Sequence, residues 1–163
     1  MQKQLHLPKT QSEKVWDIIG ISSWLTTVLF LIIIWPHLPE QTPLHMGITG
    51  KVDDWAAKES LLLLPALSVI NFLLLHLLEK NPRLHNQPER LNEKNAAAFY
   101  LLSRKTVNKL KNLGVLLLSS IAVEFSMIGM RWINHGSTWL MIIALPVYLY
   151  PIVEVIWKQR KIK

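Results

Sequence analysis

Residues 61–78 read LLLLPALSVINFLLLHLL, an apolar run that contains no charged side chain. Three further runs of similar length carry at most one acidic residue each: 18–35, 113–130 with Glu124, and 138–157 with Glu154. About 20 helical residues are needed to cross about 30 Å of hydrocarbon. The pattern therefore predicts an all-α polytopic membrane protein with four transmembrane helices, in a single domain over residues 1–163. Too little polar chain remains for a separate globular core, which excludes a soluble enzyme.

Basic residues are distributed unevenly among the segments outside these four runs. Only Lys51, Lys58 and Arg131 lie in the first and third loops, whereas the other fifteen of the 18 lysines and arginines lie in the 79–112 loop and the two terminal segments. Cytoplasmic loops of membrane proteins are enriched in Lys and Arg, so this bias predicts both termini and the 79–112 loop in the cytoplasm, and the 36–60 loop outside. The net charge of +7 is then a topology signal that faces the anionic inner leaflet, and no nucleic-acid partner is expected.

The basic 79–112 loop divides into two parts. Asn81-Pro82 ends the second helix, and Pro88 keeps residues 81–90 irregular. From Asn92 onward, a stretch rich in alanine and leucine predicts a helix that continues into the third span. We expect its basic side chains either to hold the helix at the inner leaflet surface or to be solvated by the cytoplasm: Arg104, Lys105, Lys109 and Lys111.

The 36–60 loop has the most distinctive composition. Three prolines within eight residues favour a stiff, extended segment after the first helix, and Gly47 and Gly50 permit a tight turn. Asp53 or Asp54 is expected to cap a short helix over 55–60 that leads into the second span. The loop is acidic on balance, with four carboxylates against two lysines.

Eight positions of this loop resemble the LP–P–H–G–D–aromatic–K signature of a known family: Leu38, Pro39, Pro43, His45, Gly50, Asp53, Trp55 and Lys58. The signature is that of the N-terminal membrane domain of unknown function in SdpI-like bacteriocin-immunity proteins of Gram-positive bacteria. The tract from Asn92 through Arg104 is similar to the cytoplasmic loop of that family, so the resemblance covers about residues 15–112. The chain departs from the family at Gly47, where many members have Asn. No counterpart of the second, SdpI-type half is expected, because the sequence ends after four spans.

The resemblance implies a multi-pass protein of the plasma membrane of a Gram-positive bacterium, which gives immunity against a membrane-active peptide through its outer loop. The ligand-binding candidates of the loop are then His45, Asp53 and Lys58. Its structural positions are Pro39, Pro43, Gly50 and Trp55. In the alternative interpretation the loop is a structural clip, in which His45 and Asp53 hydrogen-bond the turn and Lys58 marks the headgroup level.

Metal binding and catalysis are not expected of this loop. His37, His45 and Asp53 or Asp54 have suitable ligand types, but they lack the helical pairing typical of metal ligands. No Ser, Cys or second acid in a recognisable motif accompanies His45. We therefore expect a binding protein that is not an enzyme and has no cofactor.

Glu124 lies inside the third run, about 9 Å from its outer end at 1.5 Å per residue. An ionised carboxylate at this depth is costly, so it is expected to face the bundle, with Arg131 seven residues further along on the same face. Glu124 is either a ligand-binding or proton-transferring carboxylate, or an interhelical hydrogen-bonding group that holds the bundle together. A small ion-coupled transporter, or a transporter subunit, that uses Glu124 is the alternative to peptide immunity. The partners left open are a peptide toxin, a partner membrane protein and a second copy of the chain.

Overall fold

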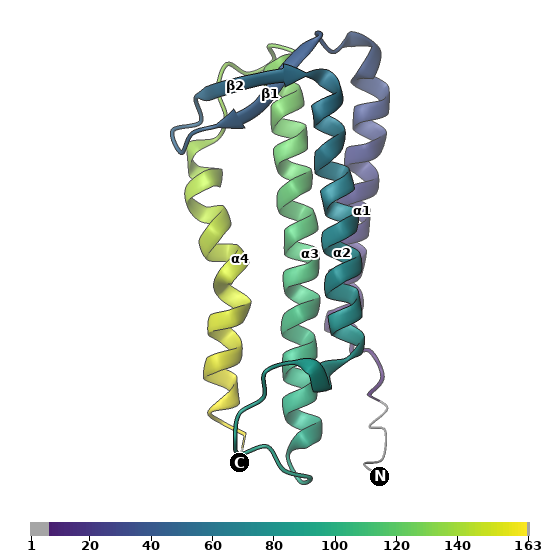
Figure 1. Cartoon of the computed structure of the whole chain (residues 1–163), viewed down its shortest axis with the longest axis vertical. Helices are drawn as coiled ribbons and strands as arrows, with labels where there is room; N and C mark the ends of the chain where they lie inside the picture. Colours follow the sequence, from purple (N-terminus) through teal and green to yellow (C-terminus); the bar gives the residue numbers. More distant parts are fainter. Residues whose placement is uncertain (1–6, 163) are drawn as a thin grey trace.

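The computed structural model describes residues 7–162, and within them four long helices run side by side along the molecule (Figure 1). They are α1 (Gln11–Ile34), α2 (Leu63–Lys80), α3 (Ala96–Gly129) and α4 (Thr138–Gln159). Each is long and apolar enough to cross a membrane. The start of α1 and the end of α4 lie at one end of the bundle, called the termini end, and the loop between α1 and α2 lies at the other, called the hairpin end (Figure 1).

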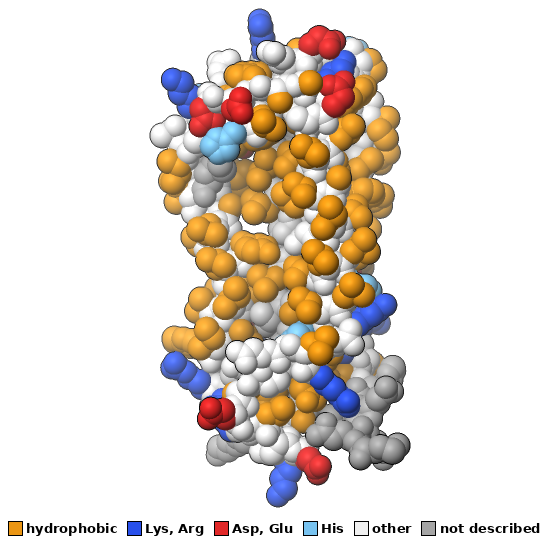
Figure 2. Space-filling model, viewed as in Figure 1, with side chains coloured by type: hydrophobic (Ala, Val, Ile, Leu, Met, Phe, Trp, Pro, Cys, Tyr) orange, Lys and Arg blue, Asp and Glu red, His pale blue; other side chains and the backbone are white. Residues whose placement is uncertain are grey.

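Polar and apolar side chains are segregated along the bundle axis. Figure 2 shows hydrophobic side chains over the middle of the visible face, with charged side chains gathered towards the two ends. The outward faces of α1, α2 and α4 are apolar, and residues such as Ile33 and Leu74 leave 71% and 59% of their surface exposed. Apolar surface of this extent is not stable in water. The fold is therefore consistent with a membrane protein.

Polar residues define where α1 and α3 begin. Thr10 and Glu13 form a capping box before α1, in which the Thr10 hydroxyl accepts the Glu13 N–H at 3.4 Å and the Glu13 carboxylate accepts the Thr10 N–H at 2.7 Å. α3 begins at Ala96, later than predicted, because Asn92 and Asn95 form a turn in which the Asn95 side chain accepts the Asn92 N–H at 2.8 Å. From Ala96 the helix continues without a break into the third apolar run, as predicted.

The central helix is α3, because α1, α2 and α4 all pack against it. Two glycines permit the closest approaches. A Cβ atom on Gly20 of α1 would lie 2.2 Å from the Asn112 side chain, and one on Gly114 of α3 would lie 2.8 Å from the Asn71 side chain. In contrast, α4 packs mainly against α3 and leaves its other faces bare, so the bundle is open between α1 and α4.

The loop between α1 and α2 folds into an antiparallel hairpin of β1 (Gln41–Met46) and β2 (Val52–Ala57). The fold is therefore mostly helical and not all-α as predicted. The predicted helix over 55–60 is wrong for 55–57, which belong to β2, whereas 58–60 lie in a short 3₁₀ helix that leads into α2. Pro43 fits in β1 because the register shifts between Pro43 and His45, at a bulge. Short 3₁₀ turns flank these elements: η1 (Trp35–His37), η2 (Lys58–Leu62) and η3 (Pro82–Leu84).

Candidate functional site

A groove of about 690 Å³ lies between α1, α3 and the start of α4, near the hairpin end. Seven hydroxyl side chains line it: Ser22, Ser23, Thr26, Thr27, Ser119, Ser120 and Ser137. Apolar residues such as Ile19 and Leu140 complete its walls, and Glu124 supplies a carboxylate. Polar groups in an apolar environment cost free energy unless they find partners. A hydroxyl-lined groove between helices that are long and apolar enough to span a membrane is therefore a candidate site for a polar group.

Glu124 is the charged residue of this groove, and only 6% of it is exposed. Its Oε1 atom accepts the backbone N–H of Ser137 at 2.6 Å, at the point where α4 begins. The carboxylate thus lies at the N-terminus of α4, where the helix dipole is positive. Its Oε2 atom is buried without a hydrogen-bond partner among the described residues. The fold engages one oxygen of Glu124 and leaves the other buried without a hydrogen bond.

Two neighbouring serines of the groove differ in their hydrogen bonding. The Ser120 hydroxyl donates to the carbonyl of Leu116 at 2.9 Å, within its own helix. The Ser119 hydroxyl is buried and has no partner in the part of the chain that the structure describes. Ser119 and Glu124, which both line the groove, therefore each carry a buried polar atom without a hydrogen-bond partner.

The turn of the hairpin contacts the segment between α3 and α4, beside Glu124. The Gly136 N–H donates to the Gly50 carbonyl at 2.8 Å. Gly136 has no room for a side chain, because a Cβ atom there would lie 2.3 Å from Met46 Sδ and 3.3 Å from Glu124 Oε2. The hairpin, the start of α4 and Glu124 are thus packed as one unit.

Strand β1 anchors the hairpin to the rest of the bundle. Met46 is buried in a core cluster with six other residues: Leu31, Ile34, Leu38, Leu61, Phe125 and Ile128. Thr42 is buried against the end of α3, where a Cβ atom on Gly129 would lie 3.1 Å from its methyl group. This apolar anchorage holds the hairpin across the end of the bundle, as Figure 1 shows.

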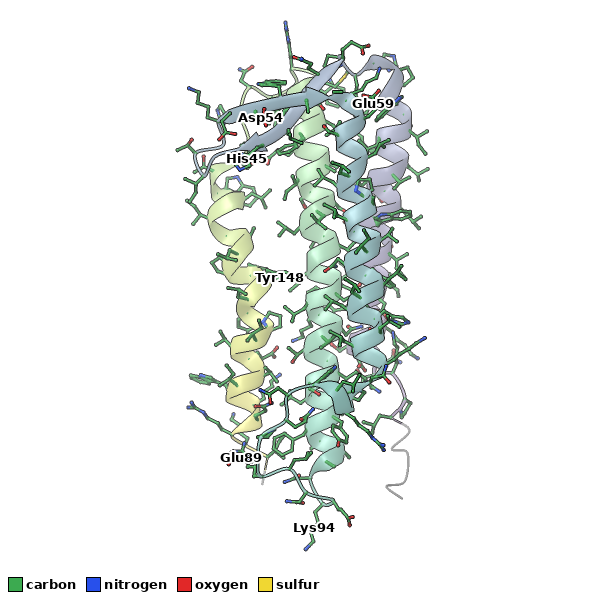
Figure 3. The ribbon with its side chains drawn as sticks, in the orientation of Figure 1. His45, Asp54, Glu59, Glu89, Lys94 and Tyr148 are labelled. Carbon is green, nitrogen blue, oxygen red and sulfur yellow. The ribbon has the colours of Figure 1, made fainter. Side chains whose placement is uncertain are left out.

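None of the ligand-binding candidates of the loop lines the groove: His45 and Asp53 lie on the hairpin surface, and Lys58 lies at the start of η2 with its side chain mostly buried. His45 Nδ1 lies 2.6 Å from Asp53 Oδ1, and both side chains are more than half exposed. The Lys58 ammonium lies 3.7 Å from the Glu40 carboxylate. Figure 3 shows His45 and Asp54 on the hairpin, far from the termini end. Among residues 7–162, no three His, Cys, Asp or Glu side chains come together as a metal site.

Three of the four structural positions of the loop hold the hairpin in place. Pro43 is fully buried, and Gly50 has a φ of 77°, a backbone conformation that favours glycine. Pro39 packs near Gly129 at the end of α3. Trp55 faces Pro43 across the hairpin, but its ring is nearly half exposed. Its position at the end of the bundle suits an interfacial tryptophan.

Arg131 does not lie where helical spacing from Glu124 predicts. α3 ends at Gly129, and Arg131 has a left-handed backbone with φ 58°. Its side chain is exposed and forms no ion pair with Glu124 in the described part of the chain. A spacing of seven residues places two side chains on the same face only while the helix continues, which explains the difference.

A second buried polar cluster, which no sequence pattern described above predicts, lies at the termini end. The Lys111 ammonium is fully buried, 2.8 Å from Asp17 of α1 and 2.5 Å from Glu79 of α2. The Lys9 ammonium pairs with the same two carboxylates. Burial alone would lower the pKa of Lys9, but its hydrogen bonds to Asp17 and Glu79 outweigh this and raise the pKa above its ordinary value. Asn108 donates hydrogen bonds to both carboxylates, and the cluster ties three helices together.

Arg104 forms an adjoining buried ion pair with Glu13, with Nε–Oε1 and Nη2–Oε2 distances of 2.7 and 3.0 Å. Its guanidinium also donates to the carbonyls of Leu7 and Pro8, which fixes the segment before α1. The predicted placement of Arg104 and Lys111 at the leaflet surface is therefore wrong, since 7% and none of their surface is exposed. The signal that could have revealed them is helical spacing: residues 104, 108, 111 and 112 share one face of α3.

Glu154 connects α4 to α3 at the termini end. Its carboxylate lies 2.5 Å from the Lys109 ammonium of α3 and 2.5 Å from that of Lys158, one turn away on α4. α4 is therefore tied to α3 near both of its ends, by Glu154 and by Glu124.

Comparison with known protein families finds a match at the hairpin end of this structure. Residues 23–69 match a domain of unknown function, DUF1648. The DUF1648 match covers the half of α1 nearest the hairpin, the whole hairpin and the first turns of α2, and it includes every position of the loop signature. Of the groove it includes Ser23, Thr26 and Thr27, whereas Glu124 lies outside it. No curated protein and no solved structure matches the chain.

Proposed function

We propose that the chain is a plasma-membrane binding protein of the SdpI-like type, from a Gram-positive bacterium, which gives immunity by binding a cationic, membrane-active peptide in the groove. The loop signature and the DUF1648 match, which covers all its positions, support the family assignment. The uneven distribution of basic residues supports an orientation with the hairpin outside and both termini in the cytoplasm. In this orientation the groove lies in the outer half of the membrane, which an external peptide enters first.

The free Oε2 atom of Glu124 is the observation that carries this proposal. A lysine ammonium of the peptide, or its N-terminal ammonium, supplies the missing partner of this buried oxygen. Hydrogen bonds to charged groups contribute about 1.5–3 kcal/mol net, which corresponds to about ten- to a hundredfold in Kd. The hydroxyls of α1 and α3 bind polar groups of the peptide, and the bare apolar surface of α4 packs against its apolar side chains.

The hairpin contributes electrostatic attraction and closes one end of the groove. The 36–60 loop carries four carboxylates against two lysines, and the pair of His45 and Asp53 is exposed. Negative charge at the surface raises the association rate of a cationic peptide, and this effect weakens with salt. Lys58, which pairs with Glu40 and lies 5.9 Å from the centre of the Trp35 ring, holds the base of the hairpin.

Equilibrium binding to the purified protein in lipid nanodiscs tests this proposal. The probe is a fluorophore-labelled amphipathic helical peptide of Leu and Lys, and binding is followed by fluorescence anisotropy. Glu124→Gln retains an oxygen that accepts the Ser137 N–H but removes the charge, so we expect it to weaken binding about tenfold or more. Glu154→Gln removes a carboxylate at the opposite end of the bundle and is the matched control. Equal affinities of the two variants would contradict the proposal.

An ion-coupled transporter, or a subunit of one, is the second candidate function. It is favoured by the extent of the groove, which reaches Ile19 and Ser23 on α1. Ser23 lies about 9 Å along the helix axis from Asp17 of the buried ion cluster. If the protein is a transporter, proteoliposomes that contain the wild type should show a proton flux, measured with an internal pH dye. The Glu124→Gln variant should abolish this flux. A peptide-binding protein predicts no flux in either sample.

A further inference from the structure

A second cavity, of about 260 Å³, lies at the termini end between the segment before α1, the end of α2, and α3. Its polar walls are formed by five side chains: Lys9, His76, Glu79, Lys80 and Arg104. We call it the termini-end pocket. It shares no lining residue with the groove, and the proposed function does not use it.

The termini-end pocket and the ion pairs beside it carry an excess of positive charge. Four cations meet three carboxylates there: Lys9, Lys80, Arg104 and Lys111 against Glu13, Asp17 and Glu79. Three of the cations are paired with these carboxylates, whereas Lys80 forms no ion pair among residues 7–162. One positive charge therefore remains for an anionic ligand.

His76 provides a second available group, one helical turn before Lys80 on α2. Its Nδ1 atom is buried and has no hydrogen-bond partner among the described residues, and it lies 3.7 Å from the Glu79 carboxylate. The imidazole stacks on Phe72 with 5.8 Å between ring centres, which fixes the ring plane. An imidazole nitrogen and an ammonium on adjacent turns can both hydrogen-bond the oxygens of one phosphate group.

The negative groups around the pocket are already engaged. Glu79 Oε2 pairs with Lys111 at 2.5 Å, and Glu79 Oε1 pairs with Lys9 and accepts a hydrogen bond from Asn108. The carbonyls at the end of α2 are capped as well: the Asn81 side chain donates to Leu77 at 2.8 Å, and the His85 ring contacts the Leu78 carbonyl at 2.9 Å. No unpaired carboxylate in the described residues therefore repels an anion from this pocket.

We infer that the termini-end pocket binds the phosphate of an anionic phospholipid headgroup. The pocket begins where the apolar run of α2 ends, so a phosphate bound there lies at the depth of the headgroups. Leu77 and Leu78 on the same turn are exposed, and acyl chains of the lipid extend along them. In the proposed orientation this is the cytoplasmic leaflet, which is rich in anionic lipids. The inference does not require that the groove binds a peptide.

Thermal unfolding of the detergent-purified full chain tests this inference. The probes are palmitoyl-oleoyl phosphatidylglycerol, which is anionic, palmitoyl-oleoyl phosphatidylcholine, which is zwitterionic, and inorganic phosphate. We expect the anionic lipid to raise the midpoint of the wild type by about 3 °C or more above the zwitterionic lipid. Lys80→Gln should lose at least half of this difference, because it removes the unpaired cation. Lys14→Gln removes the same charge from an exposed position of α1 outside the pocket and should keep the difference in full.

Each other outcome overturns the inference. If the two lipids stabilise the wild type equally, the pocket does not select an anionic headgroup. If Lys80→Gln and Lys14→Gln respond alike, the lipid acts through general surface charge and not through this pocket. If millimolar inorganic phosphate alone produces as large a shift as the anionic lipid, the ligand is free phosphate and the assignment to a lipid is wrong.

Discussion

The Glu124 carboxylate of α3 accepts the backbone N–H of Ser137 at 2.6 Å, and it thereby caps a helix to which it does not belong. The Ser137 side chain makes no capping hydrogen bond of its own, and Glu124 accepts the N–H of this N-cap residue, as the glutamate of a capping box does. The two residues are thirteen positions apart in the sequence, and the end of α3 and the loop that follows it lie between them. One oxygen of Glu124 is therefore structural, and the other is buried without a hydrogen bond and is the atom to which we assign ligand binding.

Replacement of Glu124 separates these two roles. Glu124→Ala removes the acceptor of the Ser137 N–H, and leaving a buried donor without a partner lowers the free energy of unfolding by about 1–3 kcal/mol. Glu124→Gln keeps an amide oxygen in the same place, so its thermal midpoint should stay closer to that of the wild type. Differential scanning fluorimetry in detergent measures both. A Gln variant as unstable as the Ala variant would show that the charge itself holds α4.

The contact between the hairpin and the start of α4 depends on two glycines. In Gly50→Ala the new methyl group would lie 2.1 Å from the Gly136 carbonyl, at a backbone φ of 77°. In Gly136→Ala it would clash with Met46. We expect either change to undock the hairpin, at a cost of about 1–3 kcal/mol. The hydrogen-exchange rate of the hairpin amides should rise in both variants.

Gly47 in the same turn is the matched control for the two glycines. A Cβ atom on Gly47 meets its nearest neighbour, an oxygen of Asp53, at 3.8 Å, which is an ordinary contact. Gly47→Ala should therefore leave the exchange of the hairpin amides unchanged. If Gly47→Ala disturbs the hairpin as much as Gly136→Ala, then general stiffness of the turn, and not the contact with α4, holds it in place.

Because of the buried ion cluster, replacing either of two lysines on α3 should have unequal effects on stability. Lys111→Met leaves Asp17 and Glu79 with fewer positive partners, and loss of one member of a buried ion pair costs about 3–5 kcal/mol. Lys105→Met changes a half-buried lysine that forms no ion pair in the described residues, and should cost less than about 0.5 kcal/mol. Yield of folded protein and the thermal midpoint distinguish the two. Similar midpoints would mean that the cluster contributes little to the fold.

Orientation is testable by labelling, because the chain has no native cysteine. Ile48 in the hairpin turn and Asn86 in the 81–95 loop are both exposed. With the hairpin outside, a cysteine at position 48 should react with a membrane-impermeant maleimide in intact cells, and one at position 86 should react only after the membrane is opened. The opposite pattern would place the hairpin in the cytoplasm and remove the peptide-facing role of the groove.

The helices of this fold could be predicted because a run of 18 uncharged apolar residues such as 61–78 has one stable arrangement in a bilayer, a helix across it. The hairpin could not be predicted in the same way. Its prolines suggested irregular chain, and its strands are held by contacts with distant segments, such as Gly50 with Gly136 and Met46 with the core. A two-stranded ribbon gains its stability from such packing and not from its own sequence.

The polar sites, too, could be predicted from the sequence only in part. The sequence predicts that Glu124 faces the bundle, but its partner is a backbone N–H of another helix, which no side-chain pattern indicates. The charge distribution predicts Arg104 and Lys111 only as topology signals, because a sum of charges over a loop does not distinguish buried from exposed residues. Their spacing on α3, together with Glu13 and Asp17 one turn apart on α1, contained the information that they face other helices.

The central claim is that the free oxygen of Glu124 binds a positive charge of the peptide, and a double-mutant cycle tests it most directly. Four affinities are measured in nanodiscs: wild type and Glu124→Gln, each with the Leu/Lys peptide and with peptides in which single lysines are replaced by the uncharged norleucine. For one lysine position we predict that each change alone weakens binding about tenfold and that the two together weaken it little further, a coupling of about 1.4 kcal/mol or more. Additive effects at every lysine position would mean that Glu124 does not contact a peptide cation, and would contradict the account.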